Sequence, residues 1–372
     1  MGEHSSEKPA ASFVEVVTDS ARLRELADPW NELWDRSPNA GLFQSFDYCL
    51  DAWELVARPA GHSLACLAGW RNGRLVAVWP FVTYRRHRLW TYARPLGASG
   101  VELHELLLDE TVDATAWVRE AWQALLASAR VDEVDVSFFE TSAHADALRA
   151  LPCRAAETTE TVCVSVDLRN EPDWDSYYDS LSKSSRKDFA KSRRRLEAMG
   201  PLELEVLKPG DERIGSLVDW MLAQKRRWAD RTGKKGEWLY SDHYRAFLEQ
   251  QLGRQGNGPE NVFLTLTLNG ELLAAQIGAL SKDRFEAVIA GFDADYVKHS
   301  PGARLNEAMI RWAWEHGVDC DLGAGAEPYK LFWSRNQKRT VTIRRLAVSR
   351  WGLVASALRS LQQRAKSRHA GA

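Results

Sequence analysis

The sequence has little of what would place it outside the ordinary globular proteins. Its five cysteines are scattered along 372 residues without a C-x-x-C spacing, so neither a disulfide framework nor a zinc site is expected. No apolar run approaches the roughly 18 residues that suggest a membrane-spanning helix. The first ten residues, MGEHSSEKPA, lack the apolar centre of a signal peptide. We therefore expect a metal-free globular protein of the reducing cytoplasm.

Acidic residues are missing from the last part of the chain. Residues 331–372 contain ten lysines and arginines and no aspartate or glutamate. Taking these ten from the 49 basic residues leaves 39 against 51 acidic residues, which is a net charge of −12 for residues 1–330. The charge is segregated, and the basic tail requires an explanation of its own.

Length and composition indicate two folded units. Hydrophobic residues make up 45% and charged residues 27% of the chain, which excludes collagen-like and largely disordered proteins. At roughly 150 residues per domain, the length fits two domains. We expect a disordered segment at 1–12, a first unit at 13–155, a second unit at 160–350 and a basic helix at 351–372.

Hydrophobic periodicity predicts a similar order of elements in both halves. The expected strands are 13–17, 63–70, 75–83, 131–138, 161–168, 202–207, 261–268, 271–280, 284–292, 318–322 and 341–348. The expected helices are 20–35, 46–56, 112–128, 173–181, 185–199, 214–231, 242–252 and 303–316. Asn72-Gly73 and Asn269-Gly270 each join two strands and lie 197 residues apart. Asn-Gly is a strong hairpin signal, so a duplicated α/β unit is expected.

The turn before the helix at 303–316 has the features of an anion site. The run His299-Ser300-Pro301-Gly302-Ala303-Arg304 enters this helix, and the N–H groups of a first helical turn point outward. Gly302 allows a close approach to the backbone, while Lys298 and Arg304 add positive charge. An ordinary helix start is the alternative, because Ser-Pro-Gly is common in turns.

Spaced motifs in the second half resemble the GNAT acyltransferases, in particular the bacterial cellulose-biosynthesis-type acetyltransferases. The matching residues are Gly291-Phe292-Asp293, Tyr296, Ser300-Pro301-Gly302, Leu305, Gly317, Asp319, Asp321-Leu322-Gly323, Gly325, Glu327 and Tyr329-Lys330. The resemblance continues through residues 185–197 and 225–228, and into the first half at Phe43-Gln44-Ser45, Trp53 and Val78-Trp79-Pro80. It implies an α/β fold of two tandem GNAT-like units with mixed central sheets flanked by helices, as in Fem-type aminoacyl transferases. The first unit would be degenerate.

The resemblance also implies that the second unit binds acetyl-CoA or another acyl-CoA. The pantetheine arm would pair with the strand at 284–292, through Val288, Ile289 and Ala290. The pyrophosphate would lie on Ser300, Gly302, Ala303 and Arg304. This turn departs from the GNAT pattern Q/R-x-x-G-x-G/A, because His299 occupies its first position and Arg304 its last.

Acyl transfer requires donors that polarise the thioester carbonyl and a group that takes a proton from the nucleophile. Backbone N–H groups of residues 287–290 suit the first need, and the catalytic candidates are Asp321, Glu327, Tyr329 and Lys330, with Asp293 and His299 as further titratable groups nearby. Asp321 is either a base at a strand end or a turn aspartate that caps Gly323–Gly325. Tyr329-Lys330 resembles the aromatic-lysine element of the tandem families, which gives Lys330 an electrostatic role, and a surface lysine is the alternative. Arg186, Trp228 and Asp293 are candidates for acceptor binding.

Two basic segments have open interpretations. Residues 183–195 contain seven basic residues and one acidic residue, which is typical of a solvated helix face or of a site for an acidic acceptor or the ribose phosphate of CoA. In the tail, Trp351, Val354, Leu358 and Leu361 form one helical stripe. We expect this stripe to pack on the body of the protein, and contact with anionic lipid or RNA is the alternative.

The resulting hypothesis is an acyl-CoA-dependent N-acyltransferase. The acceptor would be an amine or hydroxyl of a sugar-like or other small molecule. A Fem-type transferase that uses charged tRNA is one alternative, and a non-catalytic scaffold of polysaccharide synthesis is another. Nucleic acid is not the expected partner, whereas peripheral membrane contact through the basic tail remains open.

Overall fold

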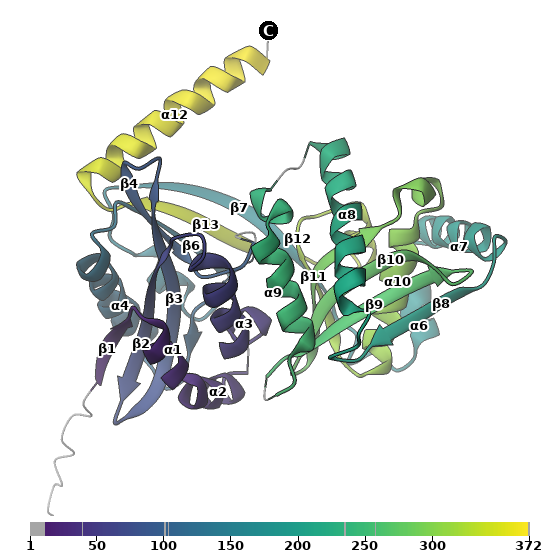
Figure 1. The fold of residues 1–372 in the computed structure, drawn as a ribbon, viewed down its shortest axis with the longest axis horizontal. Helices are drawn as coiled ribbons and strands as arrows, with labels where there is room; N and C mark the ends of the chain where they lie inside the picture. Colours follow the sequence, from purple (N-terminus) through teal and green to yellow (C-terminus); the bar gives the residue numbers. More distant parts are fainter. Residues whose placement is uncertain are drawn as a thin grey trace, which may run out of the picture. The chain divides into compact units, whose positions relative to one another are not determined.

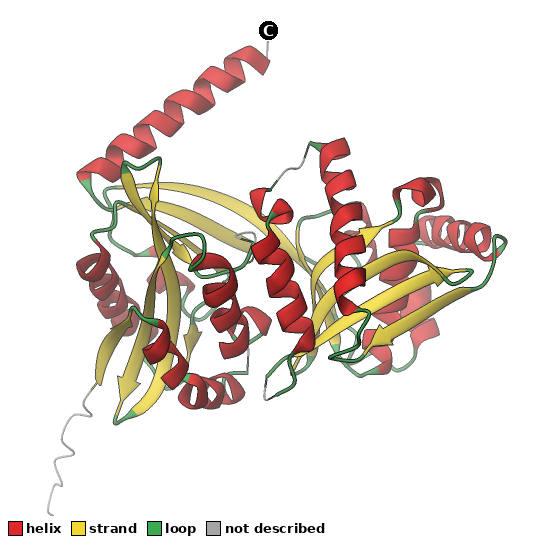
Figure 2. Cartoon of the chain, viewed as in Figure 1, coloured by secondary structure: helices red, strands yellow, loops and turns green. Residues whose placement is uncertain are grey.

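The chain folds into two compact units, each with strands flanked by helices (Figures 1 and 2). The computed structural model describes residues 12–38, 40–99, 102, 104–233, 236–256 and 258–370, without the side chains of 363, 364 and 366–370. Unit 1 comprises the described residues of Met1–Gly97, Leu103–Glu160 and Thr342–Ala372, and unit 2 those of Ala98–Glu102 and Thr161–Val341. The segment expected to be disordered, 1–12, lies outside the described residues except for Ser12.

Unit 1 is built around an antiparallel hairpin that is extended on both sides. Its helices are α1 (Ser20–Glu25), α2 (Ala27–Arg36), η1 (Leu42–Gln44), α3 (Phe46–Asp51), the π-helix η2 (Ala52–Ala57), α4 (Ala114–Ala129), α5 (Ala145–Arg149) and α12 (Arg350–Ala370). Its strands are β1 (Ser12–Val17), β2 (Ser63–Arg71), β3 (Arg74–Arg86), β4 (Trp90–Pro95), β5 (Leu107–Leu108) and β6 (Glu133–Phe139). The strand order is β1-β2-β3-β4-β6, with β5 paired to β3.

The apolar core cluster of unit 1 contains three of the sixteen tryptophans. Trp117 and Trp122 on α4 pack against strand residues such as Trp79 and Phe81, and all four are buried. Asp113 caps α4 by accepting hydrogen bonds from the amides of Thr115 and Ala116, which satisfies donors that a helix start leaves open. Aromatic rings bury large apolar surfaces, so these tryptophans stabilise the core rather than line a sugar-stacking cleft.

Unit 2 has a mixed sheet with helices on both faces. Its helices are α6 (Trp174–Ser180), α7 (Lys183–Glu197), α8 (Ile214–Thr232), η3 (Glu237–Tyr240), α9 (Asp242–Gly253), η4 (Ala294–His299), α10 (Pro301–Glu315) and α11 (Pro328–Trp333). Its strands are β8 (Leu202–Leu207), β9 (Glu260–Leu268), β10 (Glu271–Ser281), β11 (Arg284–Phe292) and β12 (Asp319–Ala324), in the order β12-β11-β10-β9-β8. Only β11 and β12 pair in parallel among these neighbours, and α10 is the crossover that connects them.

Both predicted Asn-Gly hairpins are present. Asn72 and Gly73 have φ values of 53° and 76° between β2 and β3, and Asn269 and Gly270 have 54° and 80° between β9 and β10. Two successive positive φ values are the geometry that Asn-Gly adopts in tight hairpins. The same hairpin therefore occurs once in each unit.

The last part of the chain returns to unit 1. Strands β7 (Ala155–Val166) and β13 (Arg339–Ala347) each contain residues of both units, and residues 342–370 belong to unit 1. This differs from the expected division, which placed residues up to 350 in the second unit. The reason is that the buried side chains of Leu346 and Leu148 share one core cluster, which a local pattern does not reveal. In the described part of the chain, no helix is both long and apolar enough to span a membrane.

Candidate active site

Strands β11 and β12 pair at one end and then diverge. Their parallel register joins Arg284 to Asp319, Phe285 to Cys320 and Glu286 to Asp321. Beyond Glu286, β11 continues to Phe292 without a partner strand on this side among the described residues. Gly323 has a φ of 70°, a left-handed conformation that glycine adopts readily. The turn at Gly323 carries β12 away, so the backbone of residues 287–292 keeps an open edge.

A β-bulge lies in the middle of this open edge. Ile289 pairs with Ile277 of β10, but Gly278 pairs with Ala287, so Val288 has no partner in the register. A Cβ atom on Gly278 would lie 2.6 Å from the carbonyl oxygen of Glu286, which explains why a glycine stands there. Bulges redirect backbone groups and are frequent beside active sites. The expected binding residues Val288, Ile289 and Ala290 are therefore those that the bulge reorients.

Gln276 supports the bulge from the neighbouring strand. Its side chain is 4% exposed, and its Nε2 donates to the carbonyl oxygens of Ile277 at 2.7 Å and Ile289 at 3.2 Å. A buried amide replaces the ladder hydrogen bond that the bulge removes. Gln276 is not among the residues expected from the sequence, although a glutamine within the apolar run of β10 is a usable signal.

The turn after β11 presents the start of a helix. Ser300 has a φ of 54° and precedes Pro301, the first residue of α10. The amides of Ala303 and Arg304 donate back to the carbonyl of Ser300 at 3.0 and 3.4 Å. A Cβ on Gly302 would lie 3.3 Å from the ring of Phe292, so the turn packs closely on the end of β11. The positive end of the α10 dipole thus follows the open edge directly.

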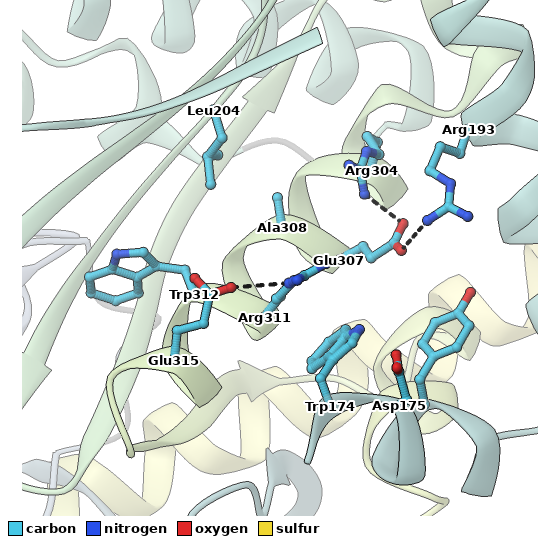
Figure 3. Close-up of a pocket in the computed structure, with 11 residues that line it drawn as sticks. Trp174, Asp175, Arg193, Leu204, Arg304, Glu307, Ala308, Arg311, Trp312 and Glu315 are labelled. Atoms are coloured by element: carbon cyan, nitrogen blue, oxygen red, sulfur yellow. Dashed lines mark hydrogen bonds and ion pairs between the residues drawn. The ribbon is translucent and has the colours of Figure 1, made fainter.

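The side chain of Arg304 is engaged away from this turn. Its Nη1 lies 2.9 Å from a carboxylate oxygen of Glu307. Glu307 also forms an ion pair with Arg193 at 3.4 Å and is 5% exposed. These residues line a pocket of about 370 Å³ beside α10 (Figure 3). Arg311 and Glu315 form a further ion pair in it, so the three arginines of the pocket face carboxylates. Arg304 therefore contributes its backbone, rather than its charge, to the turn.

Helix α7 lies against the same turn and presents basic side chains to solvent. The hydroxyl of Ser192 donates to the carbonyl of His299 at 2.5 Å. Lys183, Lys187, Lys191 and Arg194 are exposed on α7. Their spacing of three or four residues places them on one helical face. This segment is a solvent-exposed helix face that carries positive charge beside the start of α10, and both interpretations of it are compatible with this exposure.

Asp321 is held at the point where β12 turns. One carboxylate oxygen accepts the amide of Gly323 at 2.8 Å, and the other accepts Nη2 of Arg339 at 2.6 Å. Both oxygens are therefore occupied. These contacts favour the interpretation of Asp321 as a turn aspartate over that of a general base.

Lys330 and Glu327 meet in the loop that follows β12. Lys330 is 7% exposed, and its Nζ donates to the carbonyl of Ala324 at 2.5 Å. A carboxylate oxygen of Glu327 lies 3.4 Å from the same Nζ, in an ion pair that is too poorly aligned to be a hydrogen bond. The lysine is thus buried beneath the loop instead of projecting from the surface. Glu327, Tyr329 and Lys330 fall within the loop after β12 and the helix α11 that follows it, and Asp321 lies on β12 just before this loop.

Tyr329 is the member of this group with a perturbed pKa. Partial burial, together with the nearby Glu327 carboxylate, raises the pKa of the Tyr329 hydroxyl to about 12. The residue keeps 36% of its surface exposed. It is therefore a protonated hydroxyl at neutral pH that solvent and substrate can reach.

The three residues expected to bind the acceptor have local partners. Arg186 pairs with Asp179 and lies over the ring of Tyr178 at 5.9 Å. The ammonium of Lys225 lies 4.5 Å from the ring centre of Trp228. Asp293 caps η4 by accepting the amide of Asp295 at 2.9 Å. Asp293 is thus part of the turn after β11, whereas Arg186 and Trp228 lie on the flanking helices α7 and α8.

Comparison with known proteins identifies the second unit. Residues 183–331 match the family described as an acetyltransferase (GNAT) domain. This segment runs from α7 into α11 and includes β11, β12 and the turn at Gly302. No curated protein sequence matches the chain.

Solved structures share the fold of the whole chain. A tandem GNAT protein from the clavulanic acid biosynthesis pathway superposes with a TM-score of 0.51 at 14% identity, over 90% of this chain and 99% of that one. FemX superposes with a TM-score of 0.56 at 11% identity, over 86% and 95%. A conserved protein of unknown function from Bacteroides thetaiotaomicron VPI-5482 gives 0.54 at 14% identity, over 89% and 100%. The expected fold, two tandem GNAT-like α/β units, is confirmed.

Proposed function

We propose that this acyltransferase, whose residues 183–331 match a GNAT acetyltransferase domain, transfers an acyl group from an acyl-CoA to an amine or hydroxyl. Acetyl-CoA is the donor that we favour, and a sugar-like or other small molecule is the acceptor. The observation that carries the proposal is the divergence of β11 from β12 after Glu286. It leaves a strand edge that ends at the start of α10.

The chain has suitable groups for each part of CoA. The open backbone edge at Val288, Ile289 and Ala290 offers donors and acceptors for the amide groups of a pantetheine arm. Gly302, at the start of α10, suits a pyrophosphate because the helix dipole favours an anion there and a glycine allows close approach, whereas the amides of Ser300, Ala303 and Arg304 already donate within the turn. The exposed lysines of α7, which contacts this turn through Ser192 and His299, add positive charge for a ribose phosphate.

The loop after β12 supplies the groups that handle protons. Bound acyl-CoA provides the activated thioester. Tyr329 remains protonated because its pKa is raised to about 12, so we assign it the role of general acid toward the departing sulfur. Glu327 is our candidate base, since its side chain is 43% exposed, whereas both oxygens of Asp321 are occupied. Lys330 holds this loop in place through Ala324.

An acceptor screen tests the proposal. Acetyl-CoA is incubated with the full chain and with amino sugars, polyamines, amino acids or sugar alcohols, and release of the free thiol is followed. We expect one acceptor class to accelerate thiol release, and Tyr329→Phe to remove most of the acceleration. The matched control is Tyr240→Phe, because Tyr240 is an exposed tyrosine on η3. Absence of thiol release with every acceptor would contradict the use of acetyl-CoA.

A transferase that uses aminoacyl-tRNA is the second candidate, and the basic face of α7 favours it. The four exposed basic residues on this face of α7 offer a surface for phosphates. Binding of tRNA would fall steeply with salt, because each phosphate contact releases a counterion. Tight, salt-sensitive tRNA binding that Lys187→Glu/Lys191→Glu abolishes, together with no CoA binding, would favour this candidate.

A further inference from the structure

The C-terminal helix α12 presents its apolar side chains to solvent. Trp351 is 65% exposed and Leu361 60%, and between them Val354 and Leu358 are 43% and 45% exposed. Successive members are three, four and three residues apart, so they share one helical face. In Figure 1, α12 starts beside β4 and extends beyond the strands of unit 1. The expectation that this stripe packs on the body is therefore wrong.

The opposite face of α12 attaches the helix to unit 1. Arg359 donates to Glu133 at 2.5 and 2.8 Å and also to Glu157, and Glu133 is 1% exposed. The hydroxyl of Ser356 donates to Glu157 at 2.8 Å. A Cβ on Gly352 would lie 2.1 Å from the carbonyl oxygen of Asp132. Because these contacts fix the rotation of the helix about its axis, the apolar stripe must face outward.

The charge of the helix narrows the choice of partner. Residues 350–370 contain five basic residues, Arg350, Arg359, Arg364, Lys366 and Arg368, and no acidic residue. Arg359 forms ion pairs with Glu133 and Glu157, whereas Arg350 is exposed and has no ionic partner among the described residues. If a second copy packed its α12 against this one, two basic helices without acidic residues would meet, and their charges would repel each other. An apolar stripe in a basic helix is complementary to an anionic lipid surface instead.

We propose that α12 binds the surface of anionic membranes. The side chains of Trp351, Val354, Leu358 and Leu361 enter the boundary between headgroups and acyl chains, while the basic residues of the helix attract the anionic headgroups. The net charge of −12 on residues 1–330 opposes such binding elsewhere on the chain. This assignment does not depend on the reaction that unit 2 catalyses.

Flotation with lipid vesicles tests the assignment. The full chain is mixed with vesicles of phosphatidylcholine alone or with about one third phosphatidylglycerol. We expect binding to the anionic vesicles only, and weaker binding as salt rises. Trp351→Ser/Leu358→Ser/Leu361→Ser should weaken binding by on the order of a hundredfold or more, since three large apolar groups no longer insert. Arg350→Gln should weaken it by about fivefold.

Phe13→Ser is the matched control, because Phe13 is 56% exposed and lies on β1, which is separated from β4 by β2 and β3 in the strand order. It should bind like the unaltered chain. Equal binding by the triple variant, or no binding by the unaltered chain, would overturn the assignment. So would a dimer that the triple variant dissociates, or RNA binding that it abolishes, because either result assigns the stripe to a different partner.

Discussion

The ammonium nitrogen of Lys330 lies 2.5 Å from the carbonyl oxygen of Ala324. Lys330 is the third residue of α11. Its side chain points back toward Glu327, whose carboxylate oxygen is 3.4 Å away. The side chain of Glu327 lies in turn over Gly325, where a Cβ would meet it at 2.5 Å. A buried cation thus holds the loop that carries the proton-handling groups. We infer that its role is positioning, whereas the motif implied an electrostatic role.

Lys330→Met should therefore destabilise the protein. The substitution keeps an apolar stem but leaves the carbonyl of Ala324 without its buried donor and Glu327 without its ion-pair partner, and loss of the donor alone costs about 1–3 kcal/mol. Chemical denaturation of unit 2 would measure the decrease in unfolding free energy. Turnover should fall while CoA affinity is retained. Lys338→Met, at an exposed lysine, is the control, and an unchanged stability of Lys330→Met would contradict the positioning role.

Gly302→Glu should abolish the stabilisation of the protein by CoA. A side chain at this position meets Phe292, and a carboxylate opposes an anion at the helix start. For the unaltered chain, CoA at about a hundred times its dissociation constant adds about 2.7 kcal/mol, or several degrees in Tm. Gly253→Glu is the control, because Gly253 ends α9 with open space around it. An equal Tm shift in both variants would place CoA elsewhere.

Tyr329→Phe should lower kcat about a hundredfold with little change in the affinity for CoA, as expected for loss of a general acid. The pH dependence provides a second check. Since the pKa of Tyr329 is raised to about 12, its hydroxyl stays protonated through pH 10, and no loss of activity below that pH should arise from this group. A variant with unchanged kcat would remove Tyr329 from the chemistry.

The titration of His62 should make the stability of unit 1 depend on pH. Burial, with a smaller effect of Arg94, lowers the pKa of His62 to about 4, whereas an unfolded chain has a histidine pKa of about 6.5. Between these values the unfolded chain binds more protons than the folded one, so stability is complete above pH 6.5 and decreases as the pH falls toward 4. Because the ring is only partly buried, we expect a loss of about 1–2 kcal/mol.

His62→Phe keeps a ring that can stack on Tyr84, which His62 does at 4.4 Å, and removes the titrating group. Unfolding free energies at pH 7 and pH 5 should then differ less than in the unaltered chain. His243→Gln, at an exposed histidine, should leave the difference unchanged. If His62→Phe shows the same difference as the unaltered chain, His62 is not its source.

Local signals predicted most of the fold. The Asn-Gly turns, the strand at 284–292 and the helix after Pro301 are each encoded within a few neighbouring residues, and all are observed. The helix expected at 20–35 is divided at Leu26, whose amide bonds to Leu23. The helix expected at 46–56 continues as a π-helix from Ala52. These differences concern hydrogen-bond geometry, which apolar periodicity does not encode.

The details of the site depend on partners that are distant in sequence. Arg339 on β13 donates a hydrogen bond to the carboxylate of Asp321, and Ser192 on α7 donates one to the carbonyl of His299. The bulge at Val288 follows from the packing of Gly278 against Phe285 and Glu286. The outward stripe of α12 results from the ion pair between Arg359 and Glu133, which are 226 residues apart. Such contacts decide which candidate side chains are available, and no spacing within one segment predicts them.

Amide hydrogen exchange with and without acetyl-CoA tests most directly whether an acyl-CoA binds along the open edge of β11. The full chain is compared at saturating ligand, and peptides that cover β11 and the turn at Gly302 are followed. We predict slower exchange in residues 287–292 and at Gly302, because the ligand supplies partners for backbone groups there, and unchanged exchange in the β2–β3 hairpin of unit 1. Protection confined to that hairpin, or no protection at residues 287–304, would contradict the assignment.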